Sequence, residues 1–284
     1  MHRILVLGST GNIGHQVYYR LKNRVGAQVY DVSFRRKLTD DTELLDVTDS
    51  SALEYFVRGV RPDYIINCMG VLREGSRNIE NAIFMNAYLP HRLASLAHLY
   101  NSKLIHISTD CVFSGSKGKY IESDDKDGVG LYAETKSLGE VIDSQNLTLR
   151  TSTIGPELKE NGEGLFHWFM NQKEAAQGFT GAVWSGVTTI QLARAVDLAI
   201  TSDATGLHHV TNNSSISKFE LLLLLKKYTG KEITIHPVEG SKSDKSFIDT
   251  RCEINFQIPT YDEMIVAMVA DIRANERRYT YQMS

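Results

Sequence analysis

The sequence predicts an α/β fold built on a doubly wound parallel sheet of the Rossmann type, with a smaller C-terminal lobe interleaved with it. Three observations predict this fold. Short apolar runs alternate with helix-length segments up to about residue 150, the first run leads directly into a glycine-rich turn, and longer helices follow. Strand and helix in strict alternation produce right-handed βαβ units, and therefore a parallel sheet.

Five segments are expected to form buried strands, because their apolar residues run almost without interruption, as in a sheet covered on both faces. They are residues 4–8, 28–33, 64–68, 103–108 and 147–152. Helices are expected where apolar residues recur at helical spacing. These are residues 12–24, 49–60, 79–100, 132–143, 165–176, 187–200, 216–229 and 260–276, with short strands in 206–212 and 232–238.

Length and composition exclude several classes of protein. The chain has 284 residues, 42% of them hydrophobic, so it can bury a substantial core. A formal net charge of -3 offers no broad basic surface for nucleic acid. The apolar stretches are too short for a membrane span or a signal sequence, and Cys68, Cys111 and Cys252 have no metal-ligand spacing. We expect a cytoplasmic globular protein without a metal site.

A glycine-rich turn follows the first expected strand. Its three glycines are spaced three and three, between a strand and a helix. Glycine permits a tight turn, close approach of backbone N–H groups to a pyrophosphate, and close packing of helix on sheet. The pattern predicts a dinucleotide site formed by Gly8, Thr10, Gly11, Asn12, Ile13 and Gly14. Residues 1–150 are therefore expected to bind the dinucleotide, and residues 151–284 mainly the substrate, with a segment near 187–212 returning to the first domain.

Two other strand ends are expected at the same site. Asp46 and Val47 follow the second strand and its loop, where such folds hold the adenine, and the alternative for Asp46 is helix capping. Cys68, Met69 and Gly70 end the third strand and would pass beneath the ribose and diphosphate, with a simple strand-end turn as the alternative.

The end of the second strand bears on which dinucleotide is preferred. Asp31 lies 17 residues beyond the last glycine, close to the spacing at which an acidic residue bonds the ribose 2′-hydroxyl of NAD. The continuous strand pattern, however, places Asp31 in the strand interior and Ser33 at its tip, followed by Arg35 and Arg36. Hydroxyl and guanidinium groups suit a 2′-phosphate. We therefore expect NADP(H) to be preferred and NAD(H) to be usable.

Tyr132 and Lys136 form a candidate proton-transfer pair. Residues four apart share a helix face, and a nearby ammonium favours the phenolate form of tyrosine. Such a tyrosine can protonate a carbonyl oxygen while hydride adds to the carbon. Thr109, at the end of the fourth expected strand, can bind the same oxygen. Tyr18 and Lys22 share the spacing but lack such a strand end, so we expect them to be surface or packing residues.

Several motifs resemble those of one protein family. They are GSTGNIG (8–14), INCMGVL (66–72), MNAYLPHRLA (85–94), HISTDCVFSG (106–115), YAETKSLGE (132–140), LRTSTIG (149–155), WSGVTTIQLA (184–193) and NNSSISKFELL (212–222). With these motifs the chain resembles the extended short-chain dehydrogenases/reductases, of the branch similar to dTDP-4-dehydrorhamnose reductase.

The resemblance implies NAD(P)H-dependent reduction of the keto group of a nucleoside-diphosphate 4-keto-6-deoxy sugar, in surface polysaccharide or deoxysugar synthesis. It implies that Thr109 orients the keto group, that Tyr132 supplies the proton, and that Lys136 holds the nicotinamide ribose. It also places four residues near the sugar: Val71, Asn86, Asp110 and Cys111.

Two residues of the C-terminal part are further candidates for substrate binding. Trp184 could stack on the nucleotide base or pack in the core, and Arg251 could reach the substrate diphosphate or form a solvated ion pair. The resemblance also implies that helices 79–100 and 132–143 pair between two subunits, which makes a homodimer the expected assembly. Two other functions stay open, a nucleotide-sugar epimerase and a non-enzymatic regulatory subunit that binds a dinucleotide.

Overall fold

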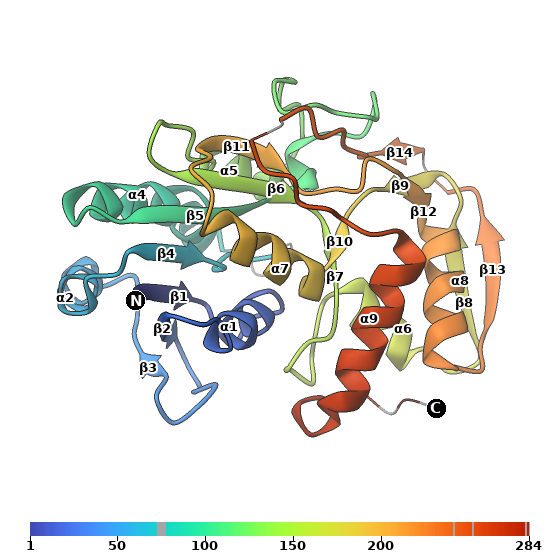
Figure 1. The fold of residues 1–284 in the computed structure, drawn as a ribbon. Coiled ribbons are helices and arrows are strands. Elements are labelled where there is room, and N and C mark those ends of the chain that lie inside the picture. Colours follow the sequence, from blue (N-terminus) through green and yellow to red (C-terminus); the bar gives the residue numbers. More distant parts are fainter. Residues whose placement is uncertain (73–77, 241, 252, 282, 284) are drawn as a thin grey trace.

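The computed structural model describes residues 1–284 apart from 73–77, 241, 252, 282 and 284, so Cys252 lies outside the described residues. A seven-stranded parallel sheet forms the centre of the molecule (Figure 1). Its strand order is β11 (Gly206–His209), β6 (Leu147–Thr151), β5 (Lys103–Thr109), β4 (Tyr64–Asn67), β1 (His2–Leu7), β2 (Ala27–Ser33) and β3 (Glu43–Leu44). The doubly wound parallel fold is therefore confirmed, and the five buried strands of the sequence analysis are all members of this sheet.

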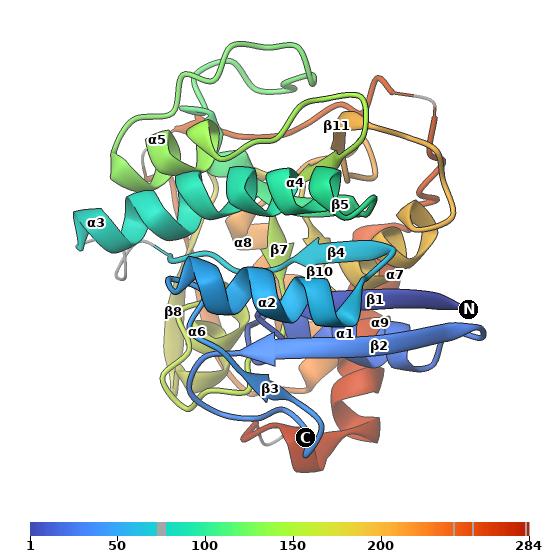
Figure 2. The ribbon, with the colours of Figure 1, turned by 90° about the vertical axis from the view of Figure 1, so that its left-hand side faces the viewer.

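Helices cover both faces of the sheet, and Figure 2 shows one of these layers in front of it. One layer consists of α1 (Gly14–Lys22) and α7 (Thr189–Ala199), and the other of α2 (Ser50–Val60), α4 (Leu89–Leu99) and α5 (Leu131–Leu138). Successive side chains of a strand point to opposite faces. In β1, Ile4 and Val6 pack toward the first layer, whereas Leu5 and Leu7 pack toward the second. All four are fully buried, which explains why this strand is apolar throughout.

The expected helix 79–100 is continuous but not uniform. It consists of α3 (Ile79–Ala82), a π-helical segment η2 (Ile83–Tyr88) and α4. The expected helix 132–143 is shorter than predicted, since α5 ends at Leu138. A Cβ atom on the next residue, Gly139, would lie 1.8 Å from the carbonyl oxygen of Asn86 in η2. Only glycine permits this approach, so the end of α5 is fixed by its contact with η2.

The C-terminal lobe has its own core, formed between three helices and short strands. The helices are α6 (Leu165–Asn171), α8 (Lys218–Thr229) and α9 (Tyr261–Ala274), followed by a 3₁₀ turn η4 (Glu276–Arg278). The strands are β7 (Thr153–Ile154), β8 (Ala175–Phe179), β9 (Ala182–Trp184), β10 (Val187–Thr188), β12 (Ile216–Ser217), β13 (Thr234–Val238) and β14 (Ser243–Asp244).

The expected helix 165–176 is wrong at its C-terminal end, where β8 begins. Alternate residues of β8 are buried, and a Cβ atom on Gly178 would lie 2.8 Å from Cα of Phe219 in α8. Burial with a period of two fits a strand and not a helix. No helix in the described part of the chain is long and apolar enough to cross a membrane.

Candidate active site

The candidate site lies at the carboxyl ends of β1, β4 and β5, neighbours in the sheet. In Figure 1 the arrowheads of β1 and β4 point toward the C-terminal lobe. The chain leaves these strands through Gly8, Cys68 and Asp110 respectively. The strand order reverses between β1 and β4, and ligands of open α/β sheets bind at such a switch point. The topology therefore brings the expected dinucleotide loop and the expected catalytic threonine to one edge.

The glycine loop closes tightly on itself. Gly8 has a φ of 82°, in the left-handed region, and its carbonyl oxygen accepts a 2.9 Å hydrogen bond from the N–H of Gly11. A Cβ atom on Gly14 would lie 2.0 Å from that oxygen, which only glycine avoids. The side-chain oxygen of Asn12 is buried without a hydrogen-bond partner among the described residues. These features fit a dinucleotide: the loop lets backbone reach the pyrophosphate, and α1 begins directly behind it.

The end of β4 packs against this loop. A Cβ atom on Gly8 would lie 2.9 Å from Cγ of Met69, and the N–H of Cys68 donates to the carbonyl oxygen of Leu7 over 3.1 Å. Burial raises the pKa of the Cys68 thiol to about 12, so this group is neutral packing material. The structure thus brings Cys68 and Met69 to the glycine loop, and their contact with ribose and diphosphate stays a prediction.

Asp31 lies inside β2, paired in register with Val6 of β1, and β2 ends at Ser33. The placement of these two residues is therefore as expected from the sequence. The hydroxyl of Ser33 donates to the carbonyl oxygen of Arg36. The Arg36 guanidinium lies 3.4 Å from the carbonyl oxygen of Leu158, and the exposed Arg35 guanidinium lies 5.5 Å from the ring of Phe34. Both cations lie just beyond the strand tip, and their contact with a 2′-phosphate stays a prediction.

Asp46 does not cap a helix. Its carboxylate accepts hydrogen bonds from the N–H and the hydroxyl of Thr48, over 2.9 and 2.7 Å, and the cap of α2 is Asp49 instead. The helix-capping alternative for Asp46 is therefore wrong, while its expected place beside the adenine stays a prediction. The side chain of Val47 is buried in the core under α2, so only the backbone of this residue is available to contact an adenine.

Thr109 is the last residue of β5 and caps the short turn η3 (Asp110–Val112). Its hydroxyl oxygen accepts from the N–H of Cys111 over 3.2 Å, and its hydroxyl lies 3.1 Å from the Asp110 carboxylate, to which it donates. Because a hydroxyl can rotate, the same group can donate to a ligand instead. Tyr132 and Lys136 are carried by α5, which packs against both β5 and η3. The structure therefore brings the strand end and the helical pair together.

Lys136 is buried beside the sheet. Its ammonium donates a 2.9 Å hydrogen bond to the carbonyl oxygen of Ile107. Burial lowers the pKa of Lys136 to about 8, against the opposing effect of the Glu140 carboxylate. Glu140 is itself held by a buried ion pair with Arg150, 2.7 Å long, and by the hydroxyl of Ser108, also at 2.7 Å. The Glu140 carboxylate, four residues after Lys136 and beyond the end of α5, thus supports the positive charge of the lysine.

Asn86 is fully buried, and its side chain is occupied by protein partners. The amide accepts from the N–H of Val71 over 2.9 Å and donates to the Val71 carbonyl oxygen over 3.1 Å and to the Thr135 hydroxyl over 3.3 Å. These contacts tie the end of β4 to α5. Asn86 therefore holds Val71 in place, and the expected position of both residues near the sugar stays a prediction.

Lys218, the first residue of α8, faces the catalytic strand end and was missed by the sequence analysis. Its ammonium lies 5.0 Å from the ring of Trp184, with Asp110 and Cys111 close enough to raise its pKa, although burial lowers that pKa overall. Among the described residues it forms no hydrogen bond, and no carboxylate lies within 4.0 Å. A lysine at a helix N-terminus opposes the helix dipole, which is the signal that could have identified it.

Trp184 belongs to the core of the C-terminal lobe and is only 3% exposed. Its ring lies 5.8 Å from that of Tyr261, and the Lys218 ammonium lies over it. The packing alternative of the sequence analysis is therefore the one the structure supports. Stacking of Trp184 on a nucleotide base would require these neighbours to move.

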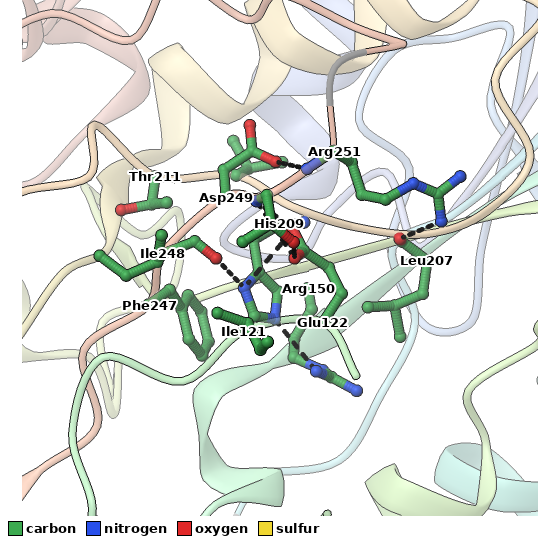
Figure 3. A network of polar contacts seen from close by, with 12 residues as sticks. Ile121, Glu122, Arg150, Leu207, His209, Thr211, Phe247, Ile248, Asp249 and Arg251 are labelled. Carbon is green, nitrogen blue, oxygen red and sulfur yellow. Dashed lines mark hydrogen bonds and ion pairs between the residues drawn. The ribbon is translucent and has the colours of Figure 1, made fainter. Parts of the chain in front are cut away.

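Arg251 lies next to the edge strand β11, and Figure 3 shows its guanidinium beside the carbonyl oxygen of Leu207. Its guanidinium pairs with Glu253 over 2.5 Å and reaches the carbonyl oxygen of Leu207, in the edge strand β11, over 3.4 Å. The ion-pair alternative thus describes Arg251, and the structure argues against its expected contact with the substrate diphosphate. The neighbouring Asp249 is half-buried close to Glu122, and burial raises its pKa to about 7.

Comparison with known proteins agrees with this geometry. The model of the family described as the RmlD substrate binding domain matches residues 1–247. The chain belongs to this family. The spore coat polysaccharide biosynthesis protein SpsK of Bacillus subtilis is 24% identical over 244 residues, which cover 83% of this chain and 82% of that protein. The dTDP-4-dehydrorhamnose reductase of Aggregatibacter actinomycetemcomitans is 24% identical, over 79% of this chain and 78% of that protein.

Solved structures show the same fold as this member of the RmlD family. The dTDP-4-dehydrorhamnose reductase of Bacillus anthracis, solved in complex with NADP, superposes with a TM-score of 0.79 at 22% identity. The superposition covers 95% of this chain and 99% of that chain. The match to the family model ends before α9, so the C-terminal helix and the segment after it lie beyond the family match.

Proposed function

We propose that this RmlD-family chain is an NAD(P)H-dependent reductase that reduces the keto group of a nucleoside-diphosphate 4-keto-6-deoxy sugar. The observation that carries the proposal is the packing of α5, which bears Tyr132 and Lys136, against the end of β5 at Thr109, on the sheet edge where β1 ends in the glycine loop. Membership of the family and the names of its relatives support the substrate class. The spore coat relative supports a place in polysaccharide synthesis.

The dinucleotide is held by the glycine loop, by the end of β4 and by the tip of β2. When bound, it supplies the hydride. The Arg35 and Arg36 guanidinium groups lie just beyond the tip of β2 and pair with the 2′-phosphate, a charged group that NAD(H) lacks. The buried Ser33 hydroxyl donates to the carbonyl oxygen of Arg36 and so holds the segment that carries these cations. NADP(H) is therefore preferred. NAD(H) remains usable because the glycine loop and Lys136 bind parts that the two dinucleotides share.

Tyr132 donates a proton to the carbonyl oxygen of the substrate. Thr109 binds the same oxygen after its hydroxyl turns away from Asp110. The Lys136 ammonium favours the phenolate that remains on Tyr132 and holds the nicotinamide ribose. A positioned general acid of this kind contributes roughly 10²–10⁴-fold to the rate. Lys218 lies near Asp110 and Cys111, just beyond the end of β5, and provides a cation for the diphosphate of the substrate.

The chain assembles as a homodimer through the helical layer that contains α4 and α5. Apolar side chains are exposed along this layer, at Ile79, Ile83, Tyr88, Leu138 and Ile142. Burial of such side chains against a second copy would remove them from water. Light scattering at micromolar concentration checks this assembly, and a mass near the 31.9 kDa of one chain would contradict it.

The function is tested with a panel of dTDP-, GDP- and UDP-linked 4-keto-6-deoxy sugars, by following oxidation of NADPH and NADH. Stoichiometric oxidation of NADPH with at least one member supports the proposal. An epimerase would interconvert nucleotide sugars without net oxidation and would keep its dinucleotide through purification. A regulatory subunit would bind dinucleotide and a partner protein without turnover. Either result would replace the proposed function.

A further inference from the structure

The segment after α9 returns to the dinucleotide site and packs on the start of α1. Tyr279, which is 8% exposed, places its hydroxyl 2.8 Å from the side-chain nitrogen of Gln16 and 3.1 Å from Nε2 of His15. His15 is fully buried, and its Nδ1 lies 2.8 Å from the carbonyl oxygen of Gly11. A continuous chain of hydrogen bonds therefore joins residue 279 to the glycine loop.

The direction of each hydrogen bond in this chain is fixed. Burial lowers the pKa of His15 to about 4, so the imidazole is neutral near neutral pH. Because a carbonyl oxygen only accepts, Nδ1 of His15 donates to Gly11 and Nε2 must accept. Tyr279 therefore donates its hydroxyl proton to His15 and accepts a hydrogen bond from Gln16. Burial also raises the pKa of Tyr279, which keeps this donor protonated.

The hydrogen bond from His15 to the carbonyl oxygen of Gly11 controls the direction in which this oxygen points. The carbonyl oxygen of Gly11 also accepts the backbone N–H of His15 over 3.3 Å, so two donors hold it. An oxygen that turned toward a pyrophosphate would repel it, whereas the N–H groups of a glycine loop attract it. Holding the Gly11 carbonyl toward His15 fixes the plane of the Gly11–Asn12 peptide and keeps this oxygen from the ligand.

Other contacts hold the C-terminal segment against the same region. The hydroxyl of Tyr281 accepts from the N–H of Glu157 and lies 3.0 Å from Nδ1 of His167, in the loop and helix that follow β7. The Arg278 guanidinium lies 3.7 Å from the ring centre of Tyr19 in α1. The segment thus bridges α1 and the loop near Leu158, which the Arg36 guanidinium also contacts. It therefore contacts α1, which begins at the glycine loop, and the loop that Arg36 also contacts.

We propose that Tyr279 is a positioning residue for the dinucleotide: through His15 it fixes the Gly11 peptide in the orientation that binds the pyrophosphate. The inference rests on the proposed function only for the identity of the dinucleotide. It assigns a role to a segment that lies outside the matched family region, which ends at residue 247. Because the loop is ordered before the ligand arrives, binding requires no free energy to reorganise it.

The test compares NADPH binding by the wild-type chain and by Tyr279→Phe, measured by fluorescence titration without nucleotide sugar. We expect the Kd of Tyr279→Phe to rise about tenfold, the effect expected from the loss of one buried hydrogen bond. Tyr100→Phe is the matched control, because it removes a hydroxyl that bonds Glu54 over 3.2 Å, away from the glycine loop. Its NADPH affinity should equal that of the wild type.

An unchanged Kd in a folded Tyr279→Phe variant would overturn the role of Tyr279, whereas a wild-type chain that binds neither dinucleotide would overturn the proposed function as well. Hydrogen exchange on the wild-type chain gives a test that does not depend on how the variant folds. The amides of Arg278 and Tyr279 donate to Asn275 and Glu276 over 2.9 and 3.0 Å, and NADPH should slow their exchange together with that of residues 8–16. Protection confined to the glycine loop would contradict the proposal.

Discussion

The ammonium nitrogen of Lys136 lies 2.9 Å from the carbonyl oxygen of Ile107, two residues before Thr109 on the same strand. This hydrogen bond joins the helix that carries Tyr132 to the strand that carries Thr109. The lysine therefore has a structural and an electrostatic role at once, since it sets the spacing between helix and strand and holds a positive charge beneath the site. Burial lowers its pKa to about 8, so this charge depends on pH near the working range.

The first prediction concerns this dependence. The pKa of Lys136 is depressed to about 8, so its charge is present below this pH and lost above it. Activity that needs the charge should fall as the pH rises through about 8, whereas an unshifted lysine would keep its charge to about pH 10. The measurement is kcat/KM against pH with saturating NADPH. In Lys136→Arg the decline should move to higher pH, and an unmoved decline would assign it to another group.

The second prediction concerns Lys218. Removing its cation in Lys218→Met should raise KM for the nucleotide sugar by roughly 10-fold to 100-fold, as expected for loss of a charge-assisted contact to a diphosphate. NADPH affinity should not change, because the residue lies on the substrate side. The matched control is Lys227→Met on the same helix, whose ammonium is exposed and pairs with Asp262 over 3.1 Å. Equal KM values for the two variants would remove Lys218 from the substrate site.

The third prediction concerns the choice of dinucleotide. Arg35→Ala/Arg36→Ala should lower kcat/KM with NADPH by about 10-fold to 100-fold and leave the value with NADH nearly unchanged, because only NADPH carries the 2′-phosphate. Arg58→Ala, which removes a guanidinium 5.5 Å from the ring of Tyr55 on α2, serves as the control. A wild-type preference for NADH, or a ratio that the double variant does not alter, would return the selection to Asp31.

The fourth prediction concerns stability in acid. Burial lowers the pKa of His15 and of His209 to about 4 and that of His106 well below 6.5. The unfolded chain therefore binds more protons below about pH 6.5, and each such histidine costs about 1.4 kcal/mol of stability per pH unit toward pH 4. Asp249 has the opposite effect. Its pKa is raised to about 7, so the folded chain binds this proton more readily than the unfolded chain, which adds stability as the pH falls below about 7.

Thermal unfolding followed by circular dichroism checks this balance. We expect Tm to be nearly constant between about pH 7 and pH 8 and to fall steadily below about pH 6.5. His15→Gln should be less stable than the wild type at neutral pH but show a shallower fall in acid. A Tm that stays constant down to about pH 4.5 would show that the three imidazoles titrate alike in the folded and unfolded chain.

The parts of the fold that sequence predicted best are those fixed by local pattern. Continuous apolar runs identified the strands of the buried sheet, and glycine spacing identified the turn before α1, because both are dictated by short-range geometry. The end of α5 was misplaced because it depends on the approach of Gly139 to Asn86, far away in the sequence. The first two residues of β8, 175 and 176, were assigned to a helix because the partner strand, β13, lies about sixty residues further along the chain.

The residues of the candidate site also fall into two groups, those that a local sequence pattern reveals and those that only the tertiary fold reveals. Thr109, Tyr132 and Lys136 were identified because a strand end and a helical spacing reveal them in the sequence. The hydrogen bonds of Asn86 to Val71 could not be predicted, because the two residues are fifteen positions apart and meet only through the tertiary fold. Lys218 and Tyr279 reach the site from the C-terminal lobe and the end of the chain, so only the tertiary arrangement reveals them.

The most direct test of the central claim is single-turnover reduction by wild type and Tyr132→Phe, each preloaded with NADPH and mixed with the active sugar of the substrate panel. The claim predicts that Tyr132→Phe keeps the wild-type Kd for NADPH and oxidises it roughly 10²–10⁴-fold more slowly, the contribution of a positioned general acid. Tyr18→Phe, the tyrosine of the same four-residue spacing in α1, should react at the wild-type rate. A Tyr132→Phe rate within about tenfold of the wild type would contradict the claim.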